Sequence, residues 1–164
     1  MVLEPLASLI RRWAPSTGIH PTPLSGLTLL YATDPSEPLA SVYKPSICVV
    51  AQGAKTATLG DQTYRYDPGH YLVTTVHLPL VGRIVEASPE RPFLSLKLSF
   101  DADLVLSVLA SVPRRDRTEV SRGVGVSSTT APLVDALVRL LGLFDKPDDL
   151  AALGARRTCG RRIS

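Results

Sequence analysis

The chain has 164 residues, of which 45% are hydrophobic and 20% are charged, so it encodes one globular domain rather than a disordered segment. Its net charge of +3 depends on four arginines in the last fourteen residues, which contain no acid; without them, 14 basic side chains face 15 acidic ones. Residues 1–150 therefore lack the broad basic face that phosphate neutralisation requires, which argues against a DNA-binding surface there.

The hydrophobic runs and the cysteines bear on where in the cell the protein is located. No run approaches the roughly 18 apolar residues of a membrane span, and charged residues interrupt the first hydrophobic stretch too early for a secretory leader. Cys48 and Cys159 make no disulfide framework, and Cys48 lies in an apolar run, as a small buried hydrophobe would. We therefore expect a cytoplasmic protein in a reducing environment, without a membrane partner.

The first hundred residues predict one helix followed by short strands. Residues 3–13 carry apolar side chains at helical spacing, and the prolines and glycine that follow end this helix and begin an irregular segment. Tight turns are predicted at residues 60–61 and 67–69. The expected strands are residues 27–33, 46–53, 54–60, 62–66, 71–76, 82–87 and 93–100. Six or seven short strands with frequent turns are typical of a sandwich or small barrel.

The remaining residues predict helices. Residues 101–112 begin with a capping Asp101 and repeat apolar residues at helical spacing, whereas residues 113–128 read as a polar, glycine-containing loop. A second helix is expected over residues 130–145, with Thr130 as its N-cap and Pro132 in its first turn. The predicted fold class is mainly β, with a helix before the barrel and two amphipathic helices after it.

A resemblance extends over about residues 15–153. The phrases "VYKPSICVVAQGAK", "LGD", "YDP", "YLV" and "EASPERPFL" together closely resemble the N-terminal domain of one branch of AraC-type bacterial transcription regulators. The resemblance implies a cupin-like β-barrel, or jelly roll, that binds an effector. It also implies a C-terminal two-helix hairpin used for dimerisation.

With this resemblance, the chain divides into four parts. Residues 1–26 hold the N-terminal helix and the segment leading into the barrel, residues 27–100 form the cupin-like barrel, and residues 101–150 form the helical dimerisation hairpin. Residues 151–164 are a basic tail that we expect to be disordered. A full regulator of this kind continues with helix-turn-helix units, which are absent from this chain, so DNA contact is expected only through that absent domain.

Catalysis finds little support in the residues. Metal-dependent cupin enzymes use two histidines one residue apart, an acid and a later histidine, whereas this chain has only His20, His70 and His77 and no such motif. Cys48 has no charged neighbour in sequence that would lower its pKa. We therefore expect no metal, no cofactor and no enzymatic activity. The alternatives are an atypical metal-dependent cupin enzyme that uses the three histidines, and a free-standing interaction module whose barrel is filled by its own side chains.

The best candidates for effector binding are amphipathic or charged side chains near the predicted barrel. Tyrosines can wall a cavity while presenting one hydroxyl to a ligand, although they also pack well in ordinary sheets. Lys97, on the strand predicted at residues 93–100, would meet an anionic effector if its face of the strand points inward. It would be solvated if that face points outward. The candidate residues are Tyr64, Tyr66, Tyr71, His77 and Lys97.

The second helix carries an apolar stripe that must be covered. We expect it to form part of a homodimer interface, and the alternative is packing on the barrel or on the 101–112 helix. The stripe consists of Leu133, Leu137, Leu140, Leu141 and Phe144. The function expected from sequence is a non-catalytic ligand-sensing and dimerisation domain, with an effector and a target DNA that the residues do not identify.

Overall fold

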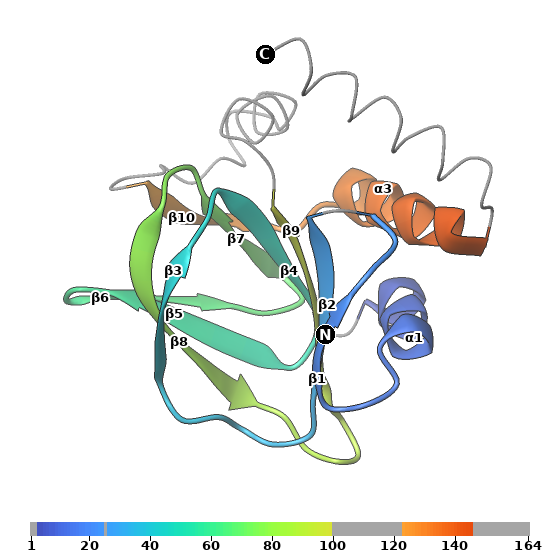
Figure 1. Cartoon of the computed structure of the whole chain (residues 1–164), viewed down its shortest axis with the longest axis horizontal. Helices are drawn as coiled ribbons and strands as arrows, with labels where there is room; N and C mark the ends of the chain where they lie inside the picture. Colours follow the sequence, from blue (N-terminus) through green and yellow to red (C-terminus); the bar gives the residue numbers. More distant parts are fainter. Residues whose placement is uncertain (1–2, 25, 100–122, 146–164) are drawn as a thin grey trace, which may run out of the picture.

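The computed structural model describes residues 3–24, 26–99 and 123–145, and these form two antiparallel sheets with helices against one of them (Figure 1). Sheet A contains, in spatial order, β1 (Gly18–Pro21), β2 (Leu27–Ala32), β9 (Phe93–Ser99), β4 (Ser46–Gln52), β7 (His70–Thr74) and β10 (Val124–Ser128). Sheet B contains β3 (Leu39–Tyr43), β8 (Leu78–Glu86), β5 (Ala54–Leu59) and β6 (Gln62–Tyr66). The helices are α1 (Glu4–Trp13), α3 (Ala131–Gly142) and the short 3-10 helix η2 (Leu143–Asp145).

Sheet A separates two hydrophobic clusters. Because side chains alternate along a strand, β9 directs Leu94 and Leu96 to the outer cluster, which includes the helices, and Phe93 to the inner cluster between the sheets. The same alternation places Val49 of β4 in the outer cluster and Val50 in the inner one. Sheet A is therefore buried on both faces, which explains why all seven residues of β4 are buried.

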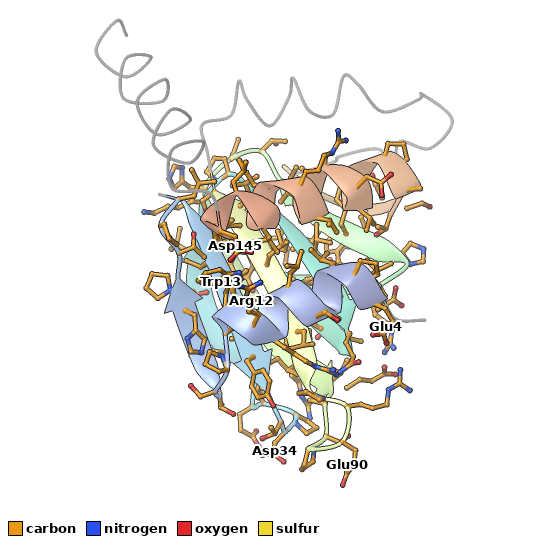
Figure 2. The ribbon with its side chains drawn as sticks, turned by 90° about the vertical axis from the view of Figure 1, so that its right-hand side faces the viewer. Glu4, Arg12, Trp13, Asp34, Glu90 and Asp145 are labelled. Atoms are coloured by element: carbon orange, nitrogen blue, oxygen red, sulfur yellow. The ribbon has the colours of Figure 1, made fainter. Side chains whose placement is uncertain are left out.

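The two helices lie across the outer face of sheet A (Figure 2). Thr130 caps α3 by accepting a hydrogen bond from the Leu133 backbone N–H, as predicted. The Trp13 ring meets the Phe144 ring edge to face, with centroids 5.6 Å apart. Arg12 makes an ion pair with Asp145 at 2.7 Å, which ties the end of η2 to the end of α1.

Two glycines shape the turns of the barrel. Gly60 has φ +60° and joins β5 to β6 through the two-residue turn predicted at residues 60–61, because Leu59 pairs directly with Gln62. Gly53 has φ +87° and lies where the chain leaves sheet A at the end of β4 and enters sheet B at the start of β5. The sheet pairings of both strands are irregular on either side of Gly53, which marks it as a corner of the barrel.

The fold class predicted from sequence is mainly β, a cupin-like barrel with an N-terminal helix and a C-terminal two-helix hairpin. The structure confirms the mainly β fold, the N-terminal helix and the second of the two C-terminal helices. The loop predicted over residues 113–128 is wrong at its end, because β10 forms there and pairs with β7. The short edge strands β1 and β3 were not predicted, since each spans only four or five residues among prolines and serines. The expected helix at 101–112 and the tail at 151–164 lie outside the described residues.

Candidate ligand-binding site

A cavity of about 320 Å³ lies between the inner faces of the two sheets. A volume of this size is at the lower end of the range for small-molecule sites, and it would hold on the order of ten water molecules. The cavity is lined by Ile19, Thr28, Leu30, Ser36, Leu39, Ser41, Tyr43, Cys48, Lys55, Tyr66, Gly82, Ile84, Ser95, Leu96 and Lys97.

Each sheet contributes one lysine to the cavity. Lys97 on β9 pairs in register with Thr28 on one side and Cys48 on the other, so it belongs to sheet A. Its ammonium lies 4.6 Å from the centroid of the Tyr43 ring, a distance at which a cation is attracted to an aromatic face. Lys55 on β5 pairs with Tyr66 and Ile84 and belongs to sheet B. The two cations therefore approach the same space from opposite walls.

The cavity also contains two buried phenols, those of Tyr43 and Tyr66. Their hydroxyl groups are hydrogen-bonded to each other. Burial raises the pKa of Tyr43 to about 12, with a further contribution from Cys48, and burial likewise raises the pKa of Tyr66. A Cβ at Gly82 would come within 2.5 Å of the Tyr43 hydroxyl oxygen, so the glycine provides the space that this hydroxyl occupies.

Burial also changes the acidity of the other ionisable groups in the cavity. It lowers the pKa of Lys55, and the neighbouring Lys97 ammonium lowers it further. Burial raises the pKa of the Cys48 thiol despite the opposing effect of the two lysines. Cys48 is therefore a protonated, poorly nucleophilic thiol at neutral pH, in agreement with its interpretation as a buried hydrophobe.

The raised tyrosine pKa predicts a loss of stability at alkaline pH. The unfolded chain releases the Tyr43 proton near pH 10, while the folded chain retains it up to about pH 12. The contribution of Tyr43 to the free energy of unfolding is therefore complete below pH 10 and is lost as the pH rises to 12. As the pH rises through this window, the free energy of unfolding should fall less steeply in Tyr43→Phe than in the wild type. We expect the two slopes to differ by about 1.4 kcal/mol per pH unit. Urea unfolding at intervals from roughly pH 8 to pH 12 measures both slopes. Equal slopes in the two proteins would contradict the assignment.

The structure brings only some of the sequence-predicted ligand residues together. Tyr66 and Lys97 line the cavity, so the face that carries Lys97 points inward and the solvated alternative does not hold. Tyr64 is partly buried against the inner cluster but does not line the cavity. Tyr71 lies in the outer cluster, on the far side of sheet A, and His77 is exposed in the link between β7 and β8. These three residues do not share the site with Tyr66 and Lys97.

Sequence reasoning missed two other residues of the site, Tyr43 and Lys55. Tyr43 ends β3, a strand that was not predicted, so nothing placed its ring in the barrel. Lys55 lies in a predicted strand in which it alternates with Ala54 and Thr56, and the register with Tyr66 shows that both point the same way. The predicted hairpin at residues 60–61 fixes this register and was the available signal for Lys55.

The three histidines do not converge. His20 lies on β1 with its Nε2 atom 2.7 Å from the Ser16 carbonyl oxygen, while His70 lies on β7 and contacts the Asp67 carboxylate at 3.2 Å. Three strands of sheet A separate β1 from β7, which corresponds to about 19 Å at the usual strand spacing. No cluster of three or more histidine, cysteine or acidic side chains that could hold a metal occurs among the described residues. A metal centre built from His20, His70 and His77 is therefore not what this fold presents.

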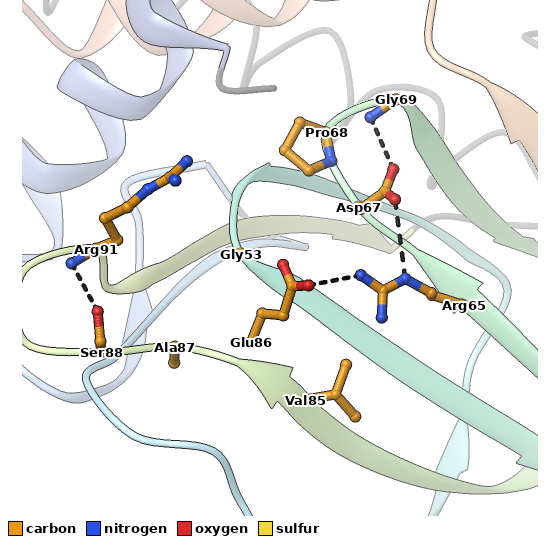
Figure 3. A pocket seen from close by; sticks show the side chains of 10 residues that line it. All are labelled: Gly53, Arg65, Asp67, Pro68, Gly69, Val85, Glu86, Ala87, Ser88 and Arg91. Carbon is orange, nitrogen blue, oxygen red and sulfur yellow. Dashed lines mark hydrogen bonds and ion pairs between the residues drawn. The ribbon is translucent and has the colours of Figure 1, made fainter.

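A second pocket, of about 570 Å³, lies at the surface where the β6–β7 turn approaches the end of β8 (Figure 3). Arg65 contacts Glu86 at 2.9 Å and Asp67 at 4.0 Å, so its charge is already balanced by these carboxylates. The Arg91 backbone N–H donates to Ser88 Oγ at 3.0 Å and closes the loop on the other side. Three of the charged residues of this pocket, Arg65, Asp67 and Glu86, already pair with one another, which makes it a weaker candidate than the cavity between the sheets.

The apolar stripe of α3 is largely covered within the subunit. Leu137, Leu141 and Phe144 are buried in the outer cluster together with residues of α1 and sheet A, while Leu133 and Leu140 are partly buried against it. Packing on the chain's own barrel and first helix covers Leu137, Leu141 and Phe144. The dimer contact through the whole stripe stays a prediction.

A family model described as the N-terminus of AraC-type transcriptional regulators matches residues 23–158. The match covers most of the chain, and this protein belongs to that family. No curated protein matches the sequence. None of the described helices is long and apolar enough to cross a membrane.

Two solved structures are similar to this chain at a low level. The apo form of a ToxT variant from Vibrio cholerae is 5% identical, with a TM-score of 0.43 over 73% of this chain. The vicilin from Solanum melongena is 15% identical, with a TM-score of 0.33 over 67% of this chain. This chain spans about half of the ToxT chain, 48%, and 37% of the vicilin chain.

Proposed function

We propose that this chain is the non-catalytic, ligand-sensing part of a cytoplasmic AraC-type transcription regulator, and that its effector binds in the cavity between the two sheets. The observation that carries the proposal is a cavity of about 320 Å³ in which polar groups from both sheets meet an otherwise apolar lining. The family supports a regulatory role, and the cavity gives that role a place for a small molecule.

The mechanism we propose is a shift between conformations of the barrel. A ligand that binds one conformation more tightly than another changes their populations, and this change reaches the helices because sheet A is the wall between them and the cavity. The helices would then alter how an attached DNA-binding domain is presented.

Dimerisation belongs to the same proposal. We propose a homodimer through the C-terminal helices, in which α3 uses the part of its surface that does not face α1, including the partly exposed Leu133 and Leu140. Sedimentation equilibrium of the wild-type protein and of Leu133→Glu tests this arrangement. A dimer that Leu133→Glu leaves intact would place the interface elsewhere.

The sensing proposal is tested by a thermal-shift screen of small molecules against three proteins. Ser41 lines the cavity from the exposed strand β3, so Ser41→Phe fills the space, whereas Ala40→Phe places the same ring on the opposite face of that strand. A ligand at one hundred times its Kd should raise the Tm of the wild type and of Ala40→Phe by about 5 to 10 °C. The same ligand should leave the Tm of Ser41→Phe unchanged.

Two outcomes would overturn the sensing proposal. One is a broad library in which no compound raises the Tm of the wild-type protein. The other is a set of binding compounds that stabilise Ser41→Phe as much as Ala40→Phe, which would place their site outside the cavity.

A further inference from the structure

We propose that the effector is a small monocarboxylate with an apolar body, whose anionic group binds next to Lys55 and Lys97 and whose apolar part extends toward the cavity mouth. The inference rests on the proposed sensing function and names the chemical class of its ligand.

The charges in the cavity favour an anion. Lys55 and Lys97 both line it, no aspartate or glutamate does, and no ion pair among the described residues involves either lysine. Two ammonium groups that share a partly desolvated space repel each other, and each loses hydration that no carboxylate of the described chain replaces. A bound anion would compensate both losses at once.

The lining favours a carboxylate over a phosphate. Phosphate sites in proteins typically combine arginine forks or helix N-termini with several donors, and this cavity contains neither an arginine nor a helix N-terminus. Two lysines with the phenols of Tyr43 and Tyr66 provide a smaller set of donors. This set fits a group with a single charge and two oxygens.

The position of the mouth indicates the apolar body. Ile19 on β1 and Leu39 on β3 both line the cavity, yet they are 72% and 70% exposed, which places them where it opens to solvent. Each lies on the edge strand of its sheet, so the opening runs between the two sheets. An apolar group that covers these side chains would remove their surface from water and close the opening.

The ligand would connect the two walls of the barrel. Lys97 belongs to sheet A, and Lys55 belongs to sheet B, with Tyr66 and Ile84 as its neighbours in register. An anion that contacts both ammonium groups would draw the sheets together at this point. The ligand class and the proposed regulation therefore depend on the same two residues.

The test compares acids with their amides by isothermal titration calorimetry at pH 7. The probes are phenylacetate and hexanoate, each with its neutral primary amide, and inorganic phosphate. We expect at least one acid to bind the wild-type protein at least tenfold more tightly than its amide. Lys55→Met and Lys97→Met should each weaken that acid at least tenfold, whereas Lys44→Met, which removes an exposed lysine, should leave its Kd unchanged.

The melting temperatures of Lys55→Met and Lys97→Met without ligand show whether the two variants fold. Removing either partly buried cation relieves repulsion, so both variants should melt, without ligand, at or above the wild-type Tm. The inference is wrong if an amide binds as tightly as its acid, if no acid binds, if the methionine variants retain wild-type affinity, or if phosphate binds more tightly than both acids. Neutral compounds that bind in the Ser41-dependent screen would, in those cases, leave the sensing function standing.

Discussion

Replacing Gly53 with alanine should lower the free energy of unfolding by about 3 kcal/mol or more. Gly53 adopts φ +87°, where an L-residue is strained, and an added Cβ would lie 2.5 Å from the Glu86 carbonyl oxygen and about 3.1 Å from the Phe93 ring. The nearest atom belongs to the backbone and cannot rotate away. Since domains are stable by only about 5 to 15 kcal/mol, this change removes a large share of the total. Urea unfolding followed by circular dichroism measures it.

Substitutions at two other glycines distinguish the cost of backbone strain from the cost of steric overlap. Gly60 also has positive φ, but nothing lies within 4 Å of an added Cβ, so Gly60→Ala should cost only about 1 to 2 kcal/mol. Gly142 ends α3 with ordinary φ and open space, so Gly142→Ala should be neutral or slightly stabilising. If Gly53→Ala costs no more than Gly60→Ala, the corner is less tightly packed than the structure indicates.

Truncating Leu141 to alanine should cost about 2 to 5 kcal/mol. Leu141 is fully buried in the outer cluster between α3 and the rest of the subunit, so its removal leaves a cavity that the surrounding side chains fill only partly. The single tryptophan, Trp13, lies against Phe144 and provides a fluorescence signal for this region. Urea unfolding monitored at Trp13 gives the loss directly.

The partly buried Leu133 on the same helix is the matched control, and Leu133→Ala should cost clearly less than Leu141→Ala. A role of Leu141 inside the subunit also predicts that its cost does not depend on protein concentration. A loss that disappears on dilution below the dimerisation constant would instead return Leu141 to a subunit interface.

The sequence predicted most of the strands, although not β1, β3 and β10, and it did not predict the interior of the barrel. Alternation along residues 93–100 showed that Lys97 shares a face with Phe93 and Ser95, yet periodicity cannot say which face points inward when both faces of a sheet are buried. The charge of Lys97 favoured an outward, solvated side chain, whereas in the structure Lys97 lines the cavity. A charged side chain that lines a cavity departs from the ordinary burial rule, so composition could not place it.

Tyr66 and Tyr71 show a second limit. They are close in sequence and were grouped for that reason, but the turn at residues 67–69 carries the chain from β6 in sheet B to β7 in sheet A. Alternation holds within a strand and is lost across such a turn. Tyr66 consequently joins the inner cluster and Tyr71 the outer one.

Because β9 has the helices on one side and the cavity on the other, adjacent positions of this strand serve separate purposes. Substitutions at Leu94 act mainly on the packing beneath the helices, whereas substitutions at Ser95 and Lys97 act mainly on the lining of the cavity. If the cavity binds an effector as proposed, selection for a new effector can change the residues on the cavity face while those on the other face keep the helices in place. A barrel of this construction could then acquire new ligand specificity without losing its packing against the helices.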